Sequence, residues 1–180
     1  MTFDFTERLN YSQGIAIGPE IERHLVRSIP LAVAFHKNTT TGNDHGIDGW
    51  IERNGLPPVS VDFKHESYCP ILRWGQHKDE ACIETVSVWR DGKEIAPGWT
   101  VNPNKRTDLV VYTWPTASEA RRFWILWFPF LCQAAIRNRA EWEYRFRVHH
   151  IRNRDYETLC MYPPRRVIAQ AMKALTSGAA

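Results

Sequence analysis

Residues 46–67 read GIDGWIERNGLPPVSVDFKHES. The turn-forming run NGLPP separates two largely apolar segments, which predicts a hairpin of two β-strands over 46–53 and 59–65. Each predicted strand carries an acid among its apolar residues, Asp48 in the first and Asp62 in the second. Gathering such charged groups in a sheet is costly unless a metal ion or another charge compensates them, so these acids require a partner.

The charged residues of the hairpin have a spacing that suits metal chemistry. The alternation in VSVDFKH places Asp62 and Lys64 on one face of the strand and Phe63 on the other. Two acids on adjacent strands can meet at a sheet edge and share a divalent cation, since hard cations prefer carboxylate and water oxygens. Lys64 can then orient the attacking water or offset charge on a phosphoryl transition state. The alternative is that Asp48 and Asp62 are salt-bridge partners at the sheet edge.

The rest of the chain predicts one α/β domain over residues 1–180, with a basic C-terminal extension from about residue 116. The capping-box pattern T-A-S-E at 116–119 predicts a helix that Pro129 kinks or ends, with Trp124 and Trp127 on one face in the core. Further helices are predicted at 18–29, 133–139 and 165–175, and further strands at 31–36, 82–90, 109–113 and 144–149.

Charge is distributed unevenly along the chain. Residues 1–120 carry a net charge of −4 and residues 121–180 a net charge of +7, against +3 overall. This asymmetry suits a metal site together with a polyanion-binding surface, and a solvated basic helix is the alternative. Arginine binds phosphate through bidentate hydrogen bonds, and an aromatic ring can stack on a base. The residues expected to contact nucleic acid are Arg73, Trp74, Lys78, Arg145, Arg147, Arg152, Arg154, Arg165 and Arg166.

The composition predicts a cytoplasmic protein with no membrane partner. The N-terminal run MTFDFTERLN lacks the basic segment followed by an apolar segment that is typical of a signal peptide. The longest apolar run, 123–132, is shorter than the about 20 residues that a bilayer requires. The four cysteines form no CxxC pair, which favours a reducing compartment and gives no zinc-site spacing.

Together these motifs resemble the PD-(D/E)XK nuclease superfamily, over roughly residues 15–115. In that family an acid precedes a two-strand hairpin whose second strand carries D/E-x-K, as Asp48 and Asp62-Phe63-Lys64 do here. The helix before the first strand often carries a glutamate, and in archaeal Holliday-junction resolvases it reads like E-R-x-L, which matches Glu22-Arg23-His24-Leu25. The chain departs from the pattern in that no proline precedes Asp48 and the second acid is not the commoner glutamate.

The resemblance implies a restriction-endonuclease-like core, a central mixed β-sheet flanked by helices, and a metal-dependent nuclease. DNA is the expected substrate and a 5′-phosphate the expected product. Mg²⁺ or Mn²⁺ would be held by Asp48, Asp62, the backbone carbonyl of Phe63 and Glu22, with Lys64 positioning the water. For Glu22 the alternative is a solvated carboxylate on the helix.

Two further implications concern the later strands and the partners. Phage-associated members of the superfamily carry further acids after D/E-x-K, and Glu84 and Asp108 occupy comparable places, where structural roles are expected. A phage-encoded origin and a homodimer are both compatible with the family, since many members dimerise to cut two strands. The rival hypothesis is a catalytically inactive module on the same fold that binds nucleic acid or protein.

Overall fold

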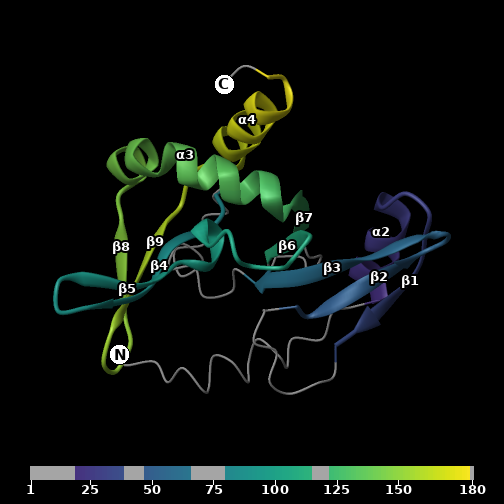
Figure 1. The fold of residues 1–180 in the computed structure, drawn as a ribbon, viewed down its shortest axis with the longest axis horizontal. Helices are drawn as coiled ribbons and strands as arrows, with labels where there is room; N and C mark the ends of the chain where they lie inside the picture. Colours follow the sequence, from purple (N-terminus) through teal and green to yellow (C-terminus); the bar gives the residue numbers. More distant parts are fainter. Residues whose placement is uncertain (1–18, 39–46, 66–79, 115–121, 179–180) are drawn as a thin grey trace. The chain divides into compact units, whose positions relative to one another are not determined.

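The computed structural model describes residues 19–38, 47–65, 80–114 and 122–178 (Figure 1). These residues form α-helices, one mixed β-sheet and one antiparallel β-sheet, so the predicted α/β class is confirmed. The described residues divide into two compact units, which we call the mixed-sheet unit (19–65 and 104–128) and the antiparallel-sheet unit (80–103 and 129–178). The prediction of a single domain is not tested by this division.

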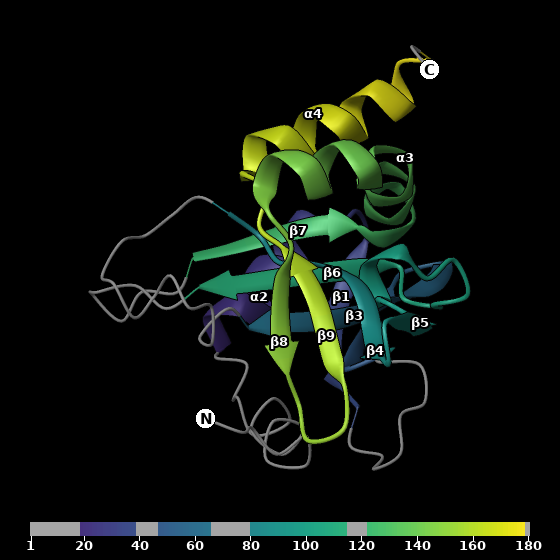
Figure 2. The same ribbon diagram turned by 90° about the vertical axis from the view of Figure 1, so that its left-hand side faces the viewer.

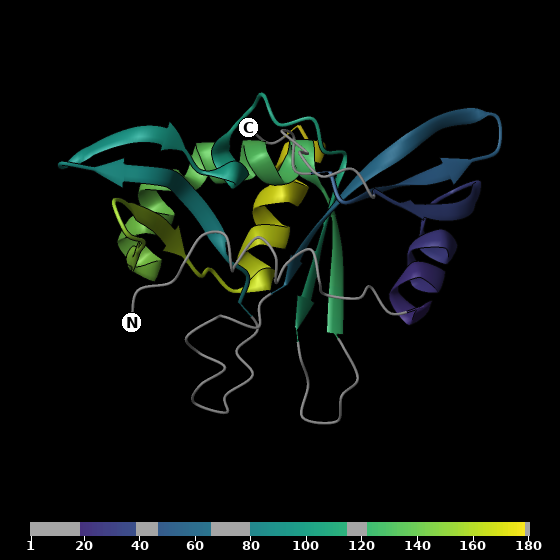
Figure 3. The same ribbon diagram turned by 90° about the horizontal axis from the view of Figure 1, so that it is seen from below.

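The mixed-sheet unit contains one helix and five strands in the order β1-β2-β3-β6-β7. β3 and β6 are parallel, whereas the other neighbours are antiparallel. In Figure 3, α2 lies alongside β1 and β2. The elements are α2 (Pro19–Ser28), β1 (Ala32–Lys37), β2 (Gly49–Arg53), β3 (Leu56–His65), β6 (Leu109–Trp114) and β7 (Arg122–Trp127).

The core of this unit lies between α2 and one face of its sheet. Pro19 occupies the first turn of α2, where its missing N–H is not needed. Ile21 and Leu25 are buried against every second residue of the sheet strands, including Val59 and Val61 of β3. Burial of each such side chain contributes about 1.5–3 kcal/mol. The predicted helix and the predicted alternation of β3 are therefore confirmed, and Asp62 lies on the face opposite α2.

Gly49 lies where residues of β1 pack tightly against the backbone of β2. A Cβ atom there would lie 2.5 Å from the Phe35 ring and 2.6 Å from the His36 carbonyl oxygen, so only glycine fits without displacing the backbone. This close approach lies directly beside Asp48 and fixes the strand that carries it.

The predicted helix through Trp127 is wrong. Arg122–Trp127 forms β7, which pairs antiparallel with β6. Alternation places Phe123 and Ile125 against the α2 core, whereas Trp124 faces the other way, near Tyr112. Trp127 is 44% exposed rather than buried with Trp124, because residues three apart in a strand point to opposite faces. The capping-box segment 116–119 lies outside the described residues.

Pro129 begins a helix instead of ending one. It is the second residue of α3 (Phe128–Phe146), a position where proline is tolerated. This helix contains the predicted segment 133–139 and continues to Phe146. The predicted strand 144–149 is therefore wrong except at His149: its first residues belong to α3, and the strand is β8 (His149–Arg152).

The antiparallel-sheet unit has strands in the order β5-β4-β9-β8, as Figure 2 shows for β8 and β9. The β4–β5 turn has positive φ at Asp91 (51°) and Gly92 (74°), as the Asp-Gly hairpin pattern predicts. The predicted C-terminal helix is also present. The remaining elements are β4 (Ile83–Arg90), β5 (Lys93–Pro97), the 3-10 helix η3 (Trp99–Val101), β9 (Glu157–Met161) and α4 (Arg165–Thr176).

Candidate functional site

The pairing of β2 with β3 brings the two predicted acids together. Asp48 directly precedes β2, whose Gly49 lies opposite Val61, and its carboxylate is close enough to that of Asp62 for the two to share a hydrogen bond. The Asp48 N–H donates to the Val61 carbonyl at 2.8 Å, and the Asp48 carbonyl accepts from the Asn38 N–H at 2.8 Å. Because its backbone is bonded on both sides, Asp48 presents its carboxylate from a fixed position.

The Asp48 carboxylate is held by the backbone of the D-x-K strand. Its Oδ2 accepts a hydrogen bond from the Phe63 N–H at 2.7 Å. The N–H and C=O of one strand residue point toward the same neighbouring strand, so the Phe63 carbonyl, a predicted ligand, faces the side of Asp48. Burial raises the pKa of Asp48 to about 6, helped by the charge of Asp62 and a side-chain hydrogen bond to it, while the Phe63 N–H and Lys64 oppose the rise.

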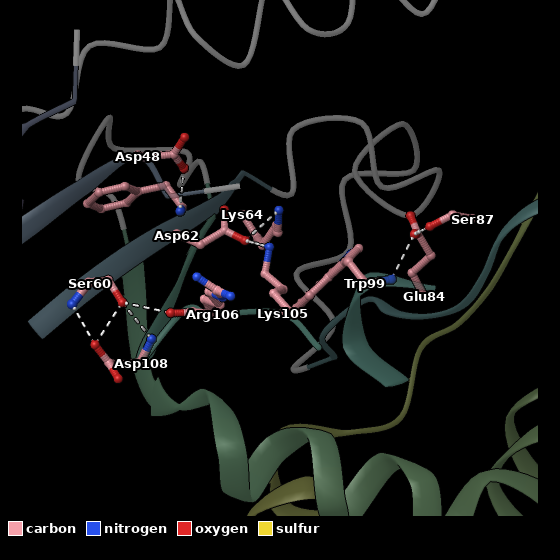
Figure 4. A network of polar contacts seen from close by, with 11 residues as sticks. Asp48, Ser60, Asp62, Lys64, Glu84, Ser87, Trp99, Lys105, Arg106 and Asp108 are labelled. Carbon is pink, nitrogen blue, oxygen red and sulfur yellow. Dashed lines mark hydrogen bonds and ion pairs between the residues drawn. The ribbon is translucent and has the colours of Figure 1, made fainter. Parts of the chain in front are cut away.

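Asp62 is paired with two lysines (Figure 4). Its side chain is 2% exposed, and its Oδ2 lies 2.9 Å from Lys64 Nζ and 2.8 Å from Lys105 Nζ. Lys64 keeps 28% of its side chain exposed, whereas Lys105 keeps 9%. Within the described residues, Oδ2 has no hydrogen-bond partner of favourable geometry, although both ammonium groups are within ion-pair distance. Charge attraction, rather than directed hydrogen bonding, therefore accounts for this cluster.

Lys105 is the site residue that sequence reasoning missed. It lies just before β6, and it reaches Asp62 because β6 pairs in parallel with β3. The only signal in the sequence is the pair Lys105-Arg106 directly before a predicted strand. That signal has meaning only once β6 is known to be the neighbour of β3.

Asp108 has the structural role that was expected of it. Its Oδ2 accepts from the Ser60 N–H at 2.8 Å and from Ser60 Oγ at 2.7 Å, and its own N–H donates to Ser60 Oγ at 2.9 Å. These bonds join β3 to the start of β6, two residues from Asp62. They fix the strand position from which Lys105 approaches.

Glu84, in the antiparallel-sheet unit, is also engaged structurally. Its Oε1 accepts from Ser87 Oγ at 2.5 Å and from the Trp99 N–H at 3.1 Å. A Cβ atom on Gly98 would lie 2.1 Å from the Glu84 carbonyl oxygen, so the chain after β5 passes directly over Glu84. The side chain thus bonds the start of η3, as a structural acid would.

The acid pair has the donor chemistry that a hard cation requires. The carboxylates of Asp48 and Asp62 lie close together, and one buried oxygen of Asp62 lacks a directed hydrogen bond within the described residues. Mg²⁺ and Mn²⁺ are bound by such oxygens, supplemented by water and a backbone carbonyl. Asp48, Asp62 and the Phe63 carbonyl are therefore the residues that would hold the ion.

Glu22 does not join this pair. It lies in the first turn of α2, whose Ile21 and Leu25 pack on the sheet face opposite Asp62. Over the ranges that the structure describes, no group of three or more acidic, histidine or cysteine side chains could hold a metal ion. The predicted third carboxylate ligand is thus not brought to the acid pair, because the helix buries its apolar side on the other face.

The expected nucleic-acid contacts fall in two parts of the chain. Arg73, Trp74 and Lys78 lie outside the described residues. The arginines after residue 144 lie in the antiparallel-sheet unit, where Arg145 pairs with Glu141 at 2.6 Å and Arg152 with Glu157 at 3.4 Å. Arg152 still leaves 85% of its side chain exposed, so it remains accessible to a polyanion. Arg147, Arg154 and Arg166 are exposed, and Arg165 is half-buried.

No protein-family model, curated protein or solved structure matches this chain. The resemblance to PD-(D/E)XK nucleases therefore rests on the sequence motifs and on the geometry of the acid pair. Among the described helices, none is long and apolar enough to cross a membrane.

The raised pKa of Asp48 predicts that stability falls as pH rises. The folded chain holds this proton up to a pH of about 6, whereas the unfolded chain releases it near 3.8. The free energy of unfolding therefore decreases as the pH rises from about 3.8 to about 6. Above pH 6 the carboxylate is ionised in both states, and the full cost of burying its charge lowers the stability. Asp48→Asn keeps an acceptor for the Phe63 N–H and removes the charge, so it should be more stable than wild type at pH 8 by about 3 kcal/mol.

Chemical unfolding in the presence of a chelator, between pH 4 and pH 8, measures this difference. The difference should shrink toward pH 4, where wild-type Asp48 is protonated in the folded state. A variant less stable than wild type at pH 8 would contradict the burial of this carboxylate beside Asp62.

Proposed function

We propose that this protein is a metal-dependent nuclease that hydrolyses phosphodiester bonds in DNA, with the mixed-sheet unit as a restriction-endonuclease-like core. The supporting observation is the juxtaposition of Asp48 and Asp62 on neighbouring strands, with Lys64 on the same face as Asp62. This is the arrangement that the D-x-K resemblance implies. Asp48, Asp62 and the Phe63 carbonyl would bind Mg²⁺ or Mn²⁺, which when bound polarises the phosphate and lowers the pKa of a water ligand.

The two lysines have different roles in this proposal. Lys64 is the more exposed, so its ammonium can leave Asp62 and contact water or a phosphate oxygen at the surface. There it orients the attacking water and stabilises negative charge as it develops. Lys105 is more buried and remains on Asp62, where it fixes the carboxylate and supplies a permanent positive charge.

The charges of the cluster suit a phosphoryl transition state. The two lysines balance Asp48 and Asp62 when both acids are ionised, so a bound divalent cation leaves an excess of two positive charges. Attack of hydroxide on a phosphodiester creates a transition state with two negative charges. Preorganised charge of opposite sign at that position lowers the barrier more than it strengthens binding of the singly charged substrate.

A second candidate function is a module that binds nucleic acid without cutting it. The observation in its favour is that Lys64 and Lys105 already neutralise Asp62 without a metal ion. In that case the cluster has a structural role, and binding depends on the basic residues elsewhere in the chain.

A panel of end-labelled substrates distinguishes the two candidates. Duplex ends, junctions, flaps and single strands of DNA and RNA are incubated with Mg²⁺, Mn²⁺ or a chelator, and gel shifts are run on the same samples. Metal-dependent cleavage that leaves 5′-phosphate ends is the result expected for the nuclease. Binding without cleavage under every condition would favour the non-catalytic module, and neither binding nor cleavage would overturn both.

The exposed arginines predict a defined change in salt dependence. Each phosphate that a protein neutralises contributes about 0.9 to the slope of log affinity against log salt concentration. If Arg152 and Arg154 contact phosphate, their joint replacement by alanine should lower that slope by about 2. The double variant Lys93→Ala, Lys173→Ala removes the same charge from exposed positions of the same unit and should change the slope less. Equal slopes for the two double variants would assign Arg152 and Arg154 to the solvated surface.

A further inference from the structure

An aromatic side chain lies on the same face of the mixed sheet as the acid pair. Trp50 of β2 pairs with Ser60 of β3, and Ser60 precedes Asp62 by two residues in that strand, so Trp50 and Asp62 are diagonal neighbours on one face, about 7 Å apart. Trp50 lies opposite His36 of β1 and Ser60 of β3. The indole therefore borders the proposed metal site along the direction of the strand.

The indole is supported on one side and open to solvent. The His36 ring stacks on it with centroids 5.7 Å apart and planes inclined by 23°. Glu52 Oε2 lies 2.8 Å from His36 Nε2, which fixes the imidazole ring against the indole. Trp50 nevertheless remains 40% exposed, although it is one of the largest apolar side chains in the unit. A ring held in place with this much open surface is suited to stacking with a planar ligand.

We propose that Trp50 is the stacking site for an unpaired nucleobase adjacent to the phosphate that is cut. This inference rests on the proposed nuclease function, because Asp48 and Asp62 define where that phosphate lies. The separation of about 7 Å between diagonal neighbours such as Trp50 and Asp62 is similar to the span from a phosphate to its own base. Aromatic rings accept any base in this way, so the site confers no sequence preference.

The stacking site defines the substrate class. Within an uninterrupted duplex both faces of a base are covered by its neighbours, so a base must be unpaired or flipped out to reach the indole. The substrate is therefore DNA with an unpaired nucleotide at the cleaved position, such as a single strand, a frayed end or a flap. An intact duplex lacks the ligand for this site.

The charges around Trp50 orient such a strand. Lys64 and Lys105 both contact Asp62 of the acid pair. The His36 ring that stacks on the indole is instead in contact with the Glu52 carboxylate. With a divalent cation bound, the acid pair and its lysines carry excess positive charge and attract phosphate, whereas the Glu52 end repels it. The backbone is thus directed to the acid pair, and the uncharged base to Trp50.

Binding measurements in a chelator test the stacking site without requiring cleavage. The probes are a single-stranded oligonucleotide and a blunt duplex of the same sequence, each containing the fluorescent base 2-aminopurine. Trp50→Leu should weaken binding of the single strand by about 10-fold or more, and should leave binding of the duplex unchanged. Trp50→Phe keeps an aromatic face and should retain most of the affinity. Quenching of 2-aminopurine by the wild type should be lost in Trp50→Leu.

Trp127→Leu is the matched control. Trp127 is 44% exposed and follows Phe123 and Ile125 in alternation, so it lies on the opposite face of the same sheet. The Trp127→Leu variant should bind both the single-stranded and the duplex probe with wild-type affinity. Equal single-strand affinity and equal quenching in wild type and Trp50→Leu would overturn the stacking site, even if the protein cuts DNA. Binding that depends on Trp50 in a protein that cuts nothing would support the stacking site and refute the nuclease alone.

Discussion

Replacing Asp62 with asparagine is expected to stop cleavage and to destabilise the metal-free protein. A neutral amide is a poor ligand for a hard cation, so cleavage should fall by about 1,000-fold or more. The same change removes the carboxylate charge that Lys64 and Lys105 both contact, and Lys105 is only 9% exposed. Removing one member of a buried ion pair costs about 3–5 kcal/mol, so the free energy of unfolding should fall by about 3 kcal/mol.

A second substitution separates the two effects. Lys105→Met removes the buried ammonium that loses its ion pair with Asp62 in Asp62→Asn, and it keeps a long apolar side chain. The double variant should regain most of the stability in a chelator and remain unable to cleave. Denaturant unfolding and the labelled-substrate panel measure the two properties independently. Unchanged stability in Asp62→Asn would show that the two ion pairs contribute little, and wild-type cleavage would place the activity at another site.

Replacing Lys64 with alanine is expected to slow cleavage by about 100-fold or more, since removing one preorganised group that stabilises transition-state charge has an effect of that size. Nucleic-acid binding should change by less than about 10-fold, because interactions that strengthen only in the transition state affect rate more than ground-state affinity. Single-turnover cleavage and gel shifts on one labelled substrate measure both quantities.

The control for this experiment is Lys37→Ala. It removes the same charge from an exposed position of the same sheet and should cut as the wild type does. A chelator should abolish cleavage by the wild type and by Lys37→Ala, and added Mg²⁺ should restore it. Cleavage by Lys64→Ala at the wild-type rate would assign the activity to another site or to a contaminant.

The acid pair could be predicted from the sequence because it depends on local periodicity. Alternation in VSVDFKH fixes the faces of β3, and the turn at Asn54-Gly55 makes β2 its antiparallel neighbour. These two local features bring Asp48, which directly precedes β2, close to Asp62 of β3. Helix α2 was predictable for the same reason, since its apolar residues recur at helical spacing within ten residues.

Lys105 and β7 could not be predicted in this way. Lys105 reaches Asp62 through a parallel pairing between strands far apart in the sequence, and no local pattern reveals which strand becomes the neighbour of β3. The run FWILW in β7 is apolar at every position, so it carries neither a two-residue nor a 3.6-residue period. Its pairing with β6 decides the outcome, and this overrides the helix-start pattern before it.

The route of the chain through its two sheets has a consequence for protein synthesis. β3 ends at His65, but its parallel partner β6 begins only at Leu109. In the other sheet, β4 pairs with β9 (Glu157–Met161), which is synthesised much later. A ribosome therefore releases β3 and β4 with open hydrogen-bonding edges long before their neighbours exist. Exposed strand edges promote association between nascent chains, and pairings between distant segments form slowly. A continuous fragment that holds every strand of one sheet also contains strands of the other, so expression of the whole chain at low temperature with chaperones should give better recovery than dissection into two pieces.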